Sequence, residues 1–221
     1  MRHNPVTIHT QENREINGPF IVPSQPDHNT VTLFEQKIAE FFGAPYAVAT
    51  DSCTSALELS LRYVKAGRIL CPKQTYLSVP MLANKLGIDL QWDDREWMDY
   101  YFITPFVIDA AVLWKPKSYI QNTLMCISFQ YQKHLSVGRL GVILCTNESD
   151  AVELKRLSYD GREPGIPWRE QNVKSFGYHY YAQPELCQIA LDKLDKAIAT
   201  EPRKWGYLDY PVLTEMDIFK L

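Results

Sequence analysis

The strongest candidate for a reactive side chain lies in the segment CISFQYQKHLSVGRLGVILC, residues 126–145. One lysine, Lys133, lies there in a turn between two apolar runs of strand length, bounded by Gly138 and Gly141. A lysine at the ends of strands, beside buried surface, loses part of its solvation. Its pKa then falls, and the neutral amine can form an imine, or Schiff base, with an aldehyde cofactor. A solvated turn lysine is the alternative, because lysines in turns are usually exposed.

A junction rich in hydroxyl groups lies within YAVATDSCTSALELSLRYV, residues 46–64. Ser52, Thr54 and Ser55 stand where a strand-like run ends and a helical pattern begins. Hydroxyls and free backbone N–H groups at a helix N-terminus favour an anion such as phosphate. The alternative is that these side chains only cap the helix. A phosphate site also requires the carboxylate of Asp51 to point away.

Two further residues suit a flat, charged cofactor. The run PFVIDAAVLW places Asp109 at the carboxyl end of a strand, where ligands of open α/β sheets bind. A carboxylate there can pair with the protonated pyridine nitrogen of pyridoxal phosphate, although it could instead cap the next element. Tyr76 follows a strand and opens a helix, so its ring can stack on such a cofactor. A tyrosine of the core or of an interface is the alternative.

Alternating strand-like and helical patterns predict an α/β fold with three layers, a mostly parallel sheet flanked by helices. Strand-like runs cover 46–50, 68–71, 88–92, 106–109, 124–129 and 140–145, and helical patterns cover 31–42, 54–65, 76–86, 150–158 and 184–199. The stretch YDGREPGIPWREQNVKSFGYHYY is rich in Gly, Pro and Arg, and it predicts a long irregular loop. Such loops are usually functional or mobile, and a disordered surface excursion is the alternative.

In their order along the chain, these motifs resemble the fold-type I pyridoxal phosphate sugar aminotransferases of the DegT/DnrJ/StrS type. The segment LFEQKIAEFFGAPYAVATDSCTSALELSL resembles the family's phosphate-binding turn with its preceding helix and strand, CPKQTY the stacking aromatic, VIDAA the ring-nitrogen aspartate and SFQYQKHLSVGRLG the lysine motif. Farther on, SYDGR and GYHYYAQPELCQIALDKL resemble an arginine loop and a helix entry that reaches the neighbouring subunit. The resemblance extends from about Ile16 to Lys196.

The resemblance implies a role for each candidate residue. Lys133 would carry pyridoxal 5'-phosphate as a Schiff base and transfer protons, while Asp109 would hold the pyridinium nitrogen. The other contacts would come from Tyr76 on the ring face, from Thr54, Ser55 and Ser128 on the phosphate, and from His179 across a dimer interface.

Departures from the family pattern bear on the activity. Cys53 stands where glycine is usual, Val112 replaces a histidine or glutamine, and His179 replaces an asparagine. Because the family's dehydratase branch has histidine in place of the lysine, Lys133 indicates transamination. We expect a cytoplasmic homodimer with shared active sites that transfers an amino group, from glutamate, to the keto sugar of a nucleotide sugar in carbohydrate biosynthesis.

Two other functions remain open from the sequence. A non-catalytic or partner-dependent regulatory protein that binds pyridoxal phosphate is suggested by the departures at Cys53 and Val112 and by the short chain. A doubly wound nucleotide-binding module is the other, with the serine-rich junction on a nucleotide phosphate. Neither a G-x-G-x-x-G nor a Walker pattern follows a strand, which disfavours the module.

Length limits what can surround the site. The 221 residues predict a single domain that binds pyridoxal phosphate, with residues 1–30 as an N-terminal arm, 31–200 as the core and 201–221 as a C-terminal tail. Compared with the family, the C-terminal small domain is reduced to that tail. The interval between Trp92 and Asp109 is also too short for the strand and helix that the family has there.

Composition excludes several classes. A net charge of −3 with dispersed basic residues does not favour nucleic acid or acidic membranes as partners. The five cysteines are widely spaced, which predicts reduced thiols rather than disulfides or a zinc site. The five histidines also lack metal-ligand spacing, so no metal is expected. No apolar run has the length of a signal peptide or a membrane span, so we expect a soluble intracellular protein whose ligands are small molecules.

Overall fold

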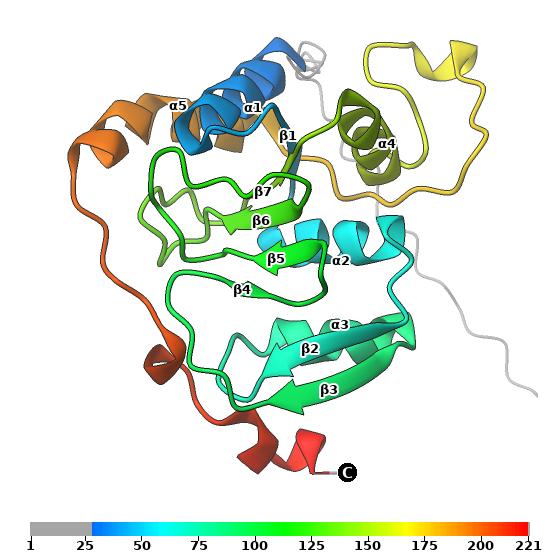
Figure 1. Cartoon of the computed structure of the whole chain (residues 1–221). Helices are drawn as coiled ribbons and strands as arrows, with labels where there is room; N and C mark the ends of the chain where they lie inside the picture. Colours follow the sequence, from blue (N-terminus) through cyan, green and yellow to red (C-terminus); the bar gives the residue numbers. More distant parts are fainter. Residues whose placement is uncertain (1–27, 221) are drawn as a thin grey trace, which may run out of the picture.

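A five-stranded mixed sheet lies between two layers of helices in the computed structural model, which describes residues 28–220 (Figure 1). The helices are α1 (His28–Phe42), α2 (Cys53–Tyr63), α3 (Ser78–Leu86), α4 (Glu148–Ser158) and α5 (Pro184–Ala199), with short 3-10 helices η1 (Trp168–Glu170), η2 (Tyr207–Asp209), η3 (Leu213–Glu215) and η4 (Asp217–Phe219). The strands are β1 (Tyr46–Thr50), β2 (Arg68–Pro72), β3 (Asp89–Asp93), β4 (Tyr101–Phe102), β5 (Val107–Asp109), β6 (Leu124–Ser128) and β7 (Gly141–Cys145).

Strand direction differs from the sequence-based prediction. The five-stranded sheet has the order β1-β7-β6-β5-β4, and β2 pairs with β3 in a second, parallel sheet. Within the larger sheet only β5 and β6 are parallel, so the prediction of a mostly parallel sheet is wrong in this respect. No helix separates β6 from β7 or β4 from β5. The turn between β4 and β5, residues 103–106, is short enough to require an antiparallel pair, because a parallel pair needs a longer crossover.

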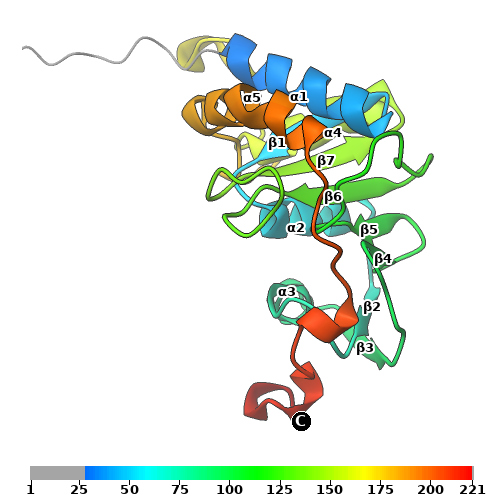
Figure 2. The ribbon, with the colours of Figure 1, turned by 90° about the vertical axis from the view of Figure 1, so that its left-hand side faces the viewer.

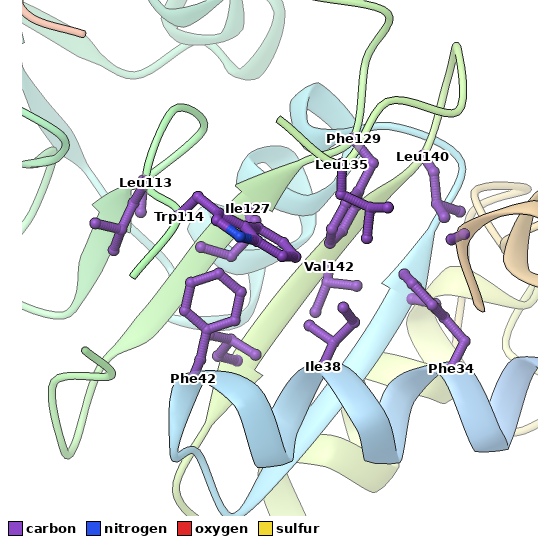
Figure 3. Packing of buried hydrophobic residues seen from close by; sticks show 14 of the residues in the cluster. Phe34, Ile38, Phe42, Leu113, Trp114, Ile127, Phe129, Leu135, Leu140 and Val142 are labelled. Atoms are coloured by element: carbon purple, nitrogen blue, oxygen red, sulfur yellow. The ribbon is translucent and has the colours of Figure 1, made fainter. Parts of the chain in front are cut away.

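The two faces of the sheet contribute to two apolar clusters. Along β6, Met125 and Ile127 pack toward α1 and α5, while Cys126 between them packs toward α2 and α4. This two-residue period follows from the pleat, which turns successive side chains to opposite faces. On α1, Phe34 and Phe42 are fully buried and point at the sheet (Figure 3). The predicted α/β fold with helices on both faces is therefore confirmed.

The C-terminal segment, residues 200–220, crosses from one sheet to the other. It leaves α5 and descends beside the strand ends to the region of α3 and β3 (Figures 1 and 2). Fully buried Leu213 anchors it, and its backbone N–H donates to the carbonyl of Lys73 at 2.7 Å. The predicted core and tail are thus in contact. Their division into parts stays a prediction, and most of the predicted arm, residues 1–30, lies outside the described residues.

Candidate active site

A cavity of about 380 Å³ lies where the start of α2, the end of β5, the loop between β6 and β7 and the C-terminal segment meet. Its size is within the range of small-molecule sites. Five of the seven residues selected from the sequence line it: Thr54, Tyr76, Asp109, Ser128 and Lys133. The fold therefore brings together side chains that are separated by up to 79 positions in the chain (133 − 54).

The loop that carries Lys133 is held by the core. Leu135 is buried in the cluster under α1, and the backbone N–H of Phe129 donates to the carbonyl of Leu140 at 2.9 Å. Within the loop, the N–H of Lys133 donates to the carbonyl of Gln130 at 2.8 Å. These bonds fix the lysine turn between the two strands, as the sequence pattern predicts.

The amine of Lys133 is partly withdrawn from water. Burial lowers the pKa of Lys133 below its ordinary value, and the nearby negative forms of Cys53 and Asp109 oppose part of this shift. The Nζ atom lies 5.1 Å from the ring centroid of Trp205, which covers it from the C-terminal segment. Among residues 28–220, no acidic side chain lies within ion-pair distance of this amine. A neutral amine is therefore accessible at lower pH than for an exposed lysine.

Asp109 is buried, and each of its carboxylate oxygens accepts one hydrogen bond. Its Oδ2 accepts from the hydroxyl of Tyr101 at 2.7 Å, and its Oδ1 accepts from the backbone N–H of Ala111 at 2.9 Å. Burial raises the pKa of Asp109, whereas these two bonds and the charge of Lys133 lower it. Each oxygen retains an unused lone pair, so the carboxylate can still accept from a ligand in the cavity.

The start of α2 forms the polar end of the cavity. Ser52 is the N-cap, and its hydroxyl accepts from the backbone N–H of Ser55 at 3.2 Å. The hydroxyl of Thr54 donates to that of Ser78 at 3.0 Å. Asp51, the residue that argues against an anion here, is neutralised by Arg139, whose Nη2 lies 2.5 Å from its Oδ2. The other carboxylate oxygen of Asp51, Oδ1, accepts from the hydroxyl of Ser52 at 3.1 Å. The groups that can meet an anion here are therefore the free N–H donors of the first helical turn, with Arg139 offsetting the charge of Asp51.

Gly141 allows this junction and the lysine loop to approach. A Cβ atom on Gly141 would lie 2.4 Å from the backbone nitrogen of Cys53 and 2.4 Å from the carbonyl carbon of Ser52. No side chain fits at such distances. The glycine that bounds the lysine motif therefore permits β7 to start directly against the N-terminus of α2.

Two selected residues lie outside the cavity. Ser55 is buried, and its hydroxyl shares a hydrogen bond of 2.9 Å with Ser52, so Ser52 rather than Ser55 presents the hydroxyl to the cavity. His179 is exposed, and its Nδ1 lies 3.0 Å from Oδ2 of Asp160. The phosphate contact of Ser55 and the contact of His179 with a partner subunit both stay predictions.

An aromatic wall was missed from the sequence. Trp97, Tyr101, Trp205 and Tyr210 line one side of the cavity, and the ring of Trp97 lies 5.0 Å from Tyr101 and 5.6 Å from Tyr210. These residues come from two segments about 100 positions apart, 97–101 and 205–210. The clustering of aromatic residues within each of these two segments was the available signal. Without a periodic pattern, it could not be placed.

The donor set fits pyridoxal phosphate. An amine with a lowered pKa can bind the aldehyde, a buried carboxylate can pair with the ring nitrogen, and the start of α2 offers hydroxyls and N–H groups to a phosphate. Within residues 28–220, no cluster of His, Cys, Asp and Glu is suited to a metal ion, and no helix is long and apolar enough to cross a membrane. All five cysteines are buried and unpaired, and a cytoplasmic location stays a prediction.

Comparison with known proteins finds a partial match to the same family. The sequence model of the DegT/DnrJ/EryC1/StrS aminotransferase family matches residues 25–121. No curated protein matches the chain. Solved structures with a similar fold include AtS13 from Actinomadura melliaura, with 18% identity and a TM-score of 0.69, and the sugar aminotransferase CalS13 from Micromonospora echinospora, with 15% identity and a TM-score of 0.64. Spr1654 from Streptococcus pneumoniae, in its PLP form, has 16% identity and a TM-score of 0.65.

These matches cover 77% of the chain but only 60% of AtS13 and Spr1654 and 61% of CalS13. The chain therefore spans about three fifths of the length of these structures. Spr1654 is also known in a PMP form. The prediction of pyridoxal phosphate as the cofactor agrees with the comparisons, since aminotransferases of this family depend on it.

Proposed function

Because the sequence model of the DegT/DnrJ/EryC1/StrS aminotransferase family matches residues 25–121, we propose that this chain is a pyridoxal phosphate-dependent sugar aminotransferase. It transfers an amino group from glutamate to the keto group of a sugar attached to a nucleotide. The observation that carries the proposal is the convergence of Lys133, Asp109 and the N-terminus of α2 on one cavity. Those are the three kinds of group that the cofactor's aldehyde, ring nitrogen and phosphate need.

Each residue has a defined task in this proposal. The amine of Lys133 would hold the cofactor through its aldehyde and, when released, would act as the general acid–base that moves a proton between the substrate carbon that bears the amino group and the former aldehyde carbon of the cofactor. Asp109 keeps the ring nitrogen protonated, and the bound cofactor then supplies an electron sink. Ser52, Thr54 and Ser128 contact the phosphate together with the first N–H groups of α2. Tyr76 covers one side of the ring, and the C-terminal segment with Trp205 excludes water above Lys133.

The full reaction tests the proposal. We expect the protein, incubated with pyridoxal phosphate, glutamate and a nucleotide-linked keto sugar, to form 2-oxoglutarate and the amino sugar in equal amounts, as measured by mass spectrometry. A nucleotide-free keto sugar and pyruvate serve as comparison acceptors. Cofactor binding without formation of either product, over a panel of donors and acceptors, would instead support a non-catalytic or regulatory protein of the same fold.

We further propose that the active enzyme is a homodimer in which His179 serves the neighbouring site. His179 lies outside the cavity of its own subunit, on a segment whose loop exposes Trp168 and Phe176 to solvent. In a two-fold dimer the same surface is used twice, so such a segment can complete the partner's cavity.

Complementation measures this sharing directly. The Lys133→Ala and His179→Ala chains should each be inactive alone and should recover up to about a quarter of the sites when mixed, if pairing is random. Only a mixed dimer then contains one cavity with both native residues. A dimeric mass in solution should accompany the recovery. Full activity of a monomer, or of His179→Ala alone, would contradict the shared site.

A further inference from the structure

The short interval before Asp109 forms a hairpin that serves the site. Strand β4 pairs antiparallel with β5, and the register sets Tyr101 directly opposite Asp109. The turn is closed by the N–H of Ile103, which donates to the carbonyl of Val107 at 2.9 Å. Directly opposed residues of an antiparallel pair are close neighbours. The short segment between Trp92 and Asp109 therefore places the phenol of Tyr101 beside the carboxylate of Asp109.

Three buried side chains form a hydrogen-bonded row behind the cavity. The hydroxyls of Thr75 and Tyr101 lie 2.5 Å apart, and the Tyr101 hydroxyl donates to Oδ2 of Asp109 at 2.7 Å. Since the single phenolic proton goes to the carboxylate, the hydroxyl of Thr75 donates to the phenolic oxygen. The exposed fractions are 2% for Thr75, 3% for Tyr101 and 5% for Asp109, so water does not compete for these bonds. Connected hydrogen bonds polarise one another, so each bond in this row is stronger than it would be alone.

We propose that Tyr101, supported by Thr75, is a positioning residue that keeps the Asp109 carboxylate charged and directed into the cavity. The bond from Tyr101 occupies one oxygen and the N–H of Ala111 occupies the other, which fixes the plane of the carboxylate. Its role in catalysis rests on the proposed function, whereas its effect on Asp109 is a property of the folded chain alone.

Competing effects show why Asp109 needs this support. Burial favours the neutral acid, and a neutral acid cannot act as the charged partner of a pyridinium nitrogen. The titratable groups that face Asp109 come from several elements and are Cys53, Cys71, Tyr101, Cys126, Lys133 and Tyr210. Among these groups only the amine of Lys133 is a cation that can stabilise the charged carboxylate. Burial also raises the pKa of the Tyr101 phenol well above its ordinary value, so this phenol remains a proton donor.

A titration of the cofactor-free protein tests the proposal. We would label aspartate side chains with carbon-13, assign the Asp109 signal by its loss in Asp109→Asn, and follow its chemical shift with pH by NMR. In Tyr101→Phe the ring still packs against Trp97 but the hydroxyl is lost. We expect the pKa of Asp109 to rise by about one to two units, the effect of losing one hydrogen bond to a charged group.

Matched variants separate this effect from general disturbance. Tyr100→Phe changes an exposed tyrosine of the same hairpin and should leave the pKa of Asp109 unchanged. Thr75→Val should raise it by a smaller amount, and Thr75→Ser, which keeps the hydroxyl, should restore it. An Asp109 pKa in Tyr101→Phe equal to that of the wild type would overturn the proposal. If Tyr101→Phe does not fold, the comparison of Thr75→Val with Thr75→Ser decides, and equal values overturn it.

The positioning role of Tyr101 and the proposed aminotransferase activity can be refuted independently of each other. The NMR measurement uses neither cofactor nor substrate, so an inactive protein with a shifted Asp109 pKa would refute the aminotransferase and leave the role of Tyr101 intact. Conversely, an active enzyme with an unshifted pKa in Tyr101→Phe would refute only the positioning role.

Discussion

Replacing Lys133 by alanine should lower the turnover number at least about 100- to 10,000-fold, the range expected when a general acid–base group is lost. The reduction should be at the upper end, because the same amine also holds the cofactor. Steady-state kinetics with saturating pyridoxal phosphate, glutamate and acceptor measures the effect. The site does not contain another lysine that could substitute, since Lys133 is the only lysine lining the cavity among residues 28–220.

A matched lysine controls for charge and for local disturbance. Lys204 is exposed and lies beside Trp205, which covers the amine of Lys133, but it does not line the cavity. Lys204→Ala should therefore keep nearly full turnover. Lys133→Arg retains the positive charge yet cannot form the covalent bond, and it should be as inactive as the alanine variant. Turnover within a few-fold of wild type in Lys133→Arg would show that the charge alone matters and that the covalent role is wrong.

Replacing Asp109 by asparagine should lower turnover about 150- to 5,000-fold while cofactor still binds. The amide keeps the shape of the side chain, but it cannot act as the negative partner of a protonated ring nitrogen. Loss of one partner from a buried charge pair costs about 3–5 kcal/mol, and each 1.36 kcal/mol corresponds to a factor of ten in rate. Single-turnover kinetics, with absorbance to count bound cofactor, measures both quantities. An unchanged rate would remove Asp109 from the mechanism.

The unfolding temperature of Asp109→Asn shows whether its lost activity comes from the chemistry or from misfolding. The pKa of Asp109 is raised in the folded protein, so the folded state holds the proton more tightly than the unfolded state. Its contribution to stability is therefore present at low pH and is lost as the pH rises through the folded-state pKa. At neutral pH, Asp109→Asn should thus retain or raise the unfolding temperature of the cofactor-free protein. A clearly lowered unfolding temperature would attribute the lost activity to the fold.

Local patterns in the sequence predicted most of the elements. The predicted helix 184–199 has the same bounds as α5, where Pro184 suits the first turn and an apolar face repeats with helical spacing. The strand-like runs 46–50 and 124–129 correspond to β1 and β6 within one residue at each end. Lys133 and Asp109 could be selected because each stands at the end of such a run, and their positions depend mainly on these local elements.

What the sequence could not supply depends on long-range contacts. Strand β4 has only two residues, too few for any periodic pattern. The role of Tyr101 depends on its pairing with Asp109 across the hairpin, which the sequence does not show. Trp205 lies over Lys133 in a segment whose backbone is held by a distant contact, since the carbonyl of Trp205 accepts from the N–H of Asp99 at 3.1 Å. No local pattern predicts this contact. The choice between Ser52 and Ser55 depends on side-chain direction at the helix cap, which residue types alone do not fix.

Borohydride reduction followed by peptide mapping tests the central claim, that Lys133 holds pyridoxal phosphate, most directly. The protein would be loaded with the cofactor, reduced, digested and analysed by mass spectrometry. We expect a single pyridoxyl-phosphate adduct, on Lys133 in the peptide that contains residues 126–139, and its loss when glutamate is added before reduction. An adduct on a different lysine, or no adduct at saturating cofactor, would contradict this account of the site.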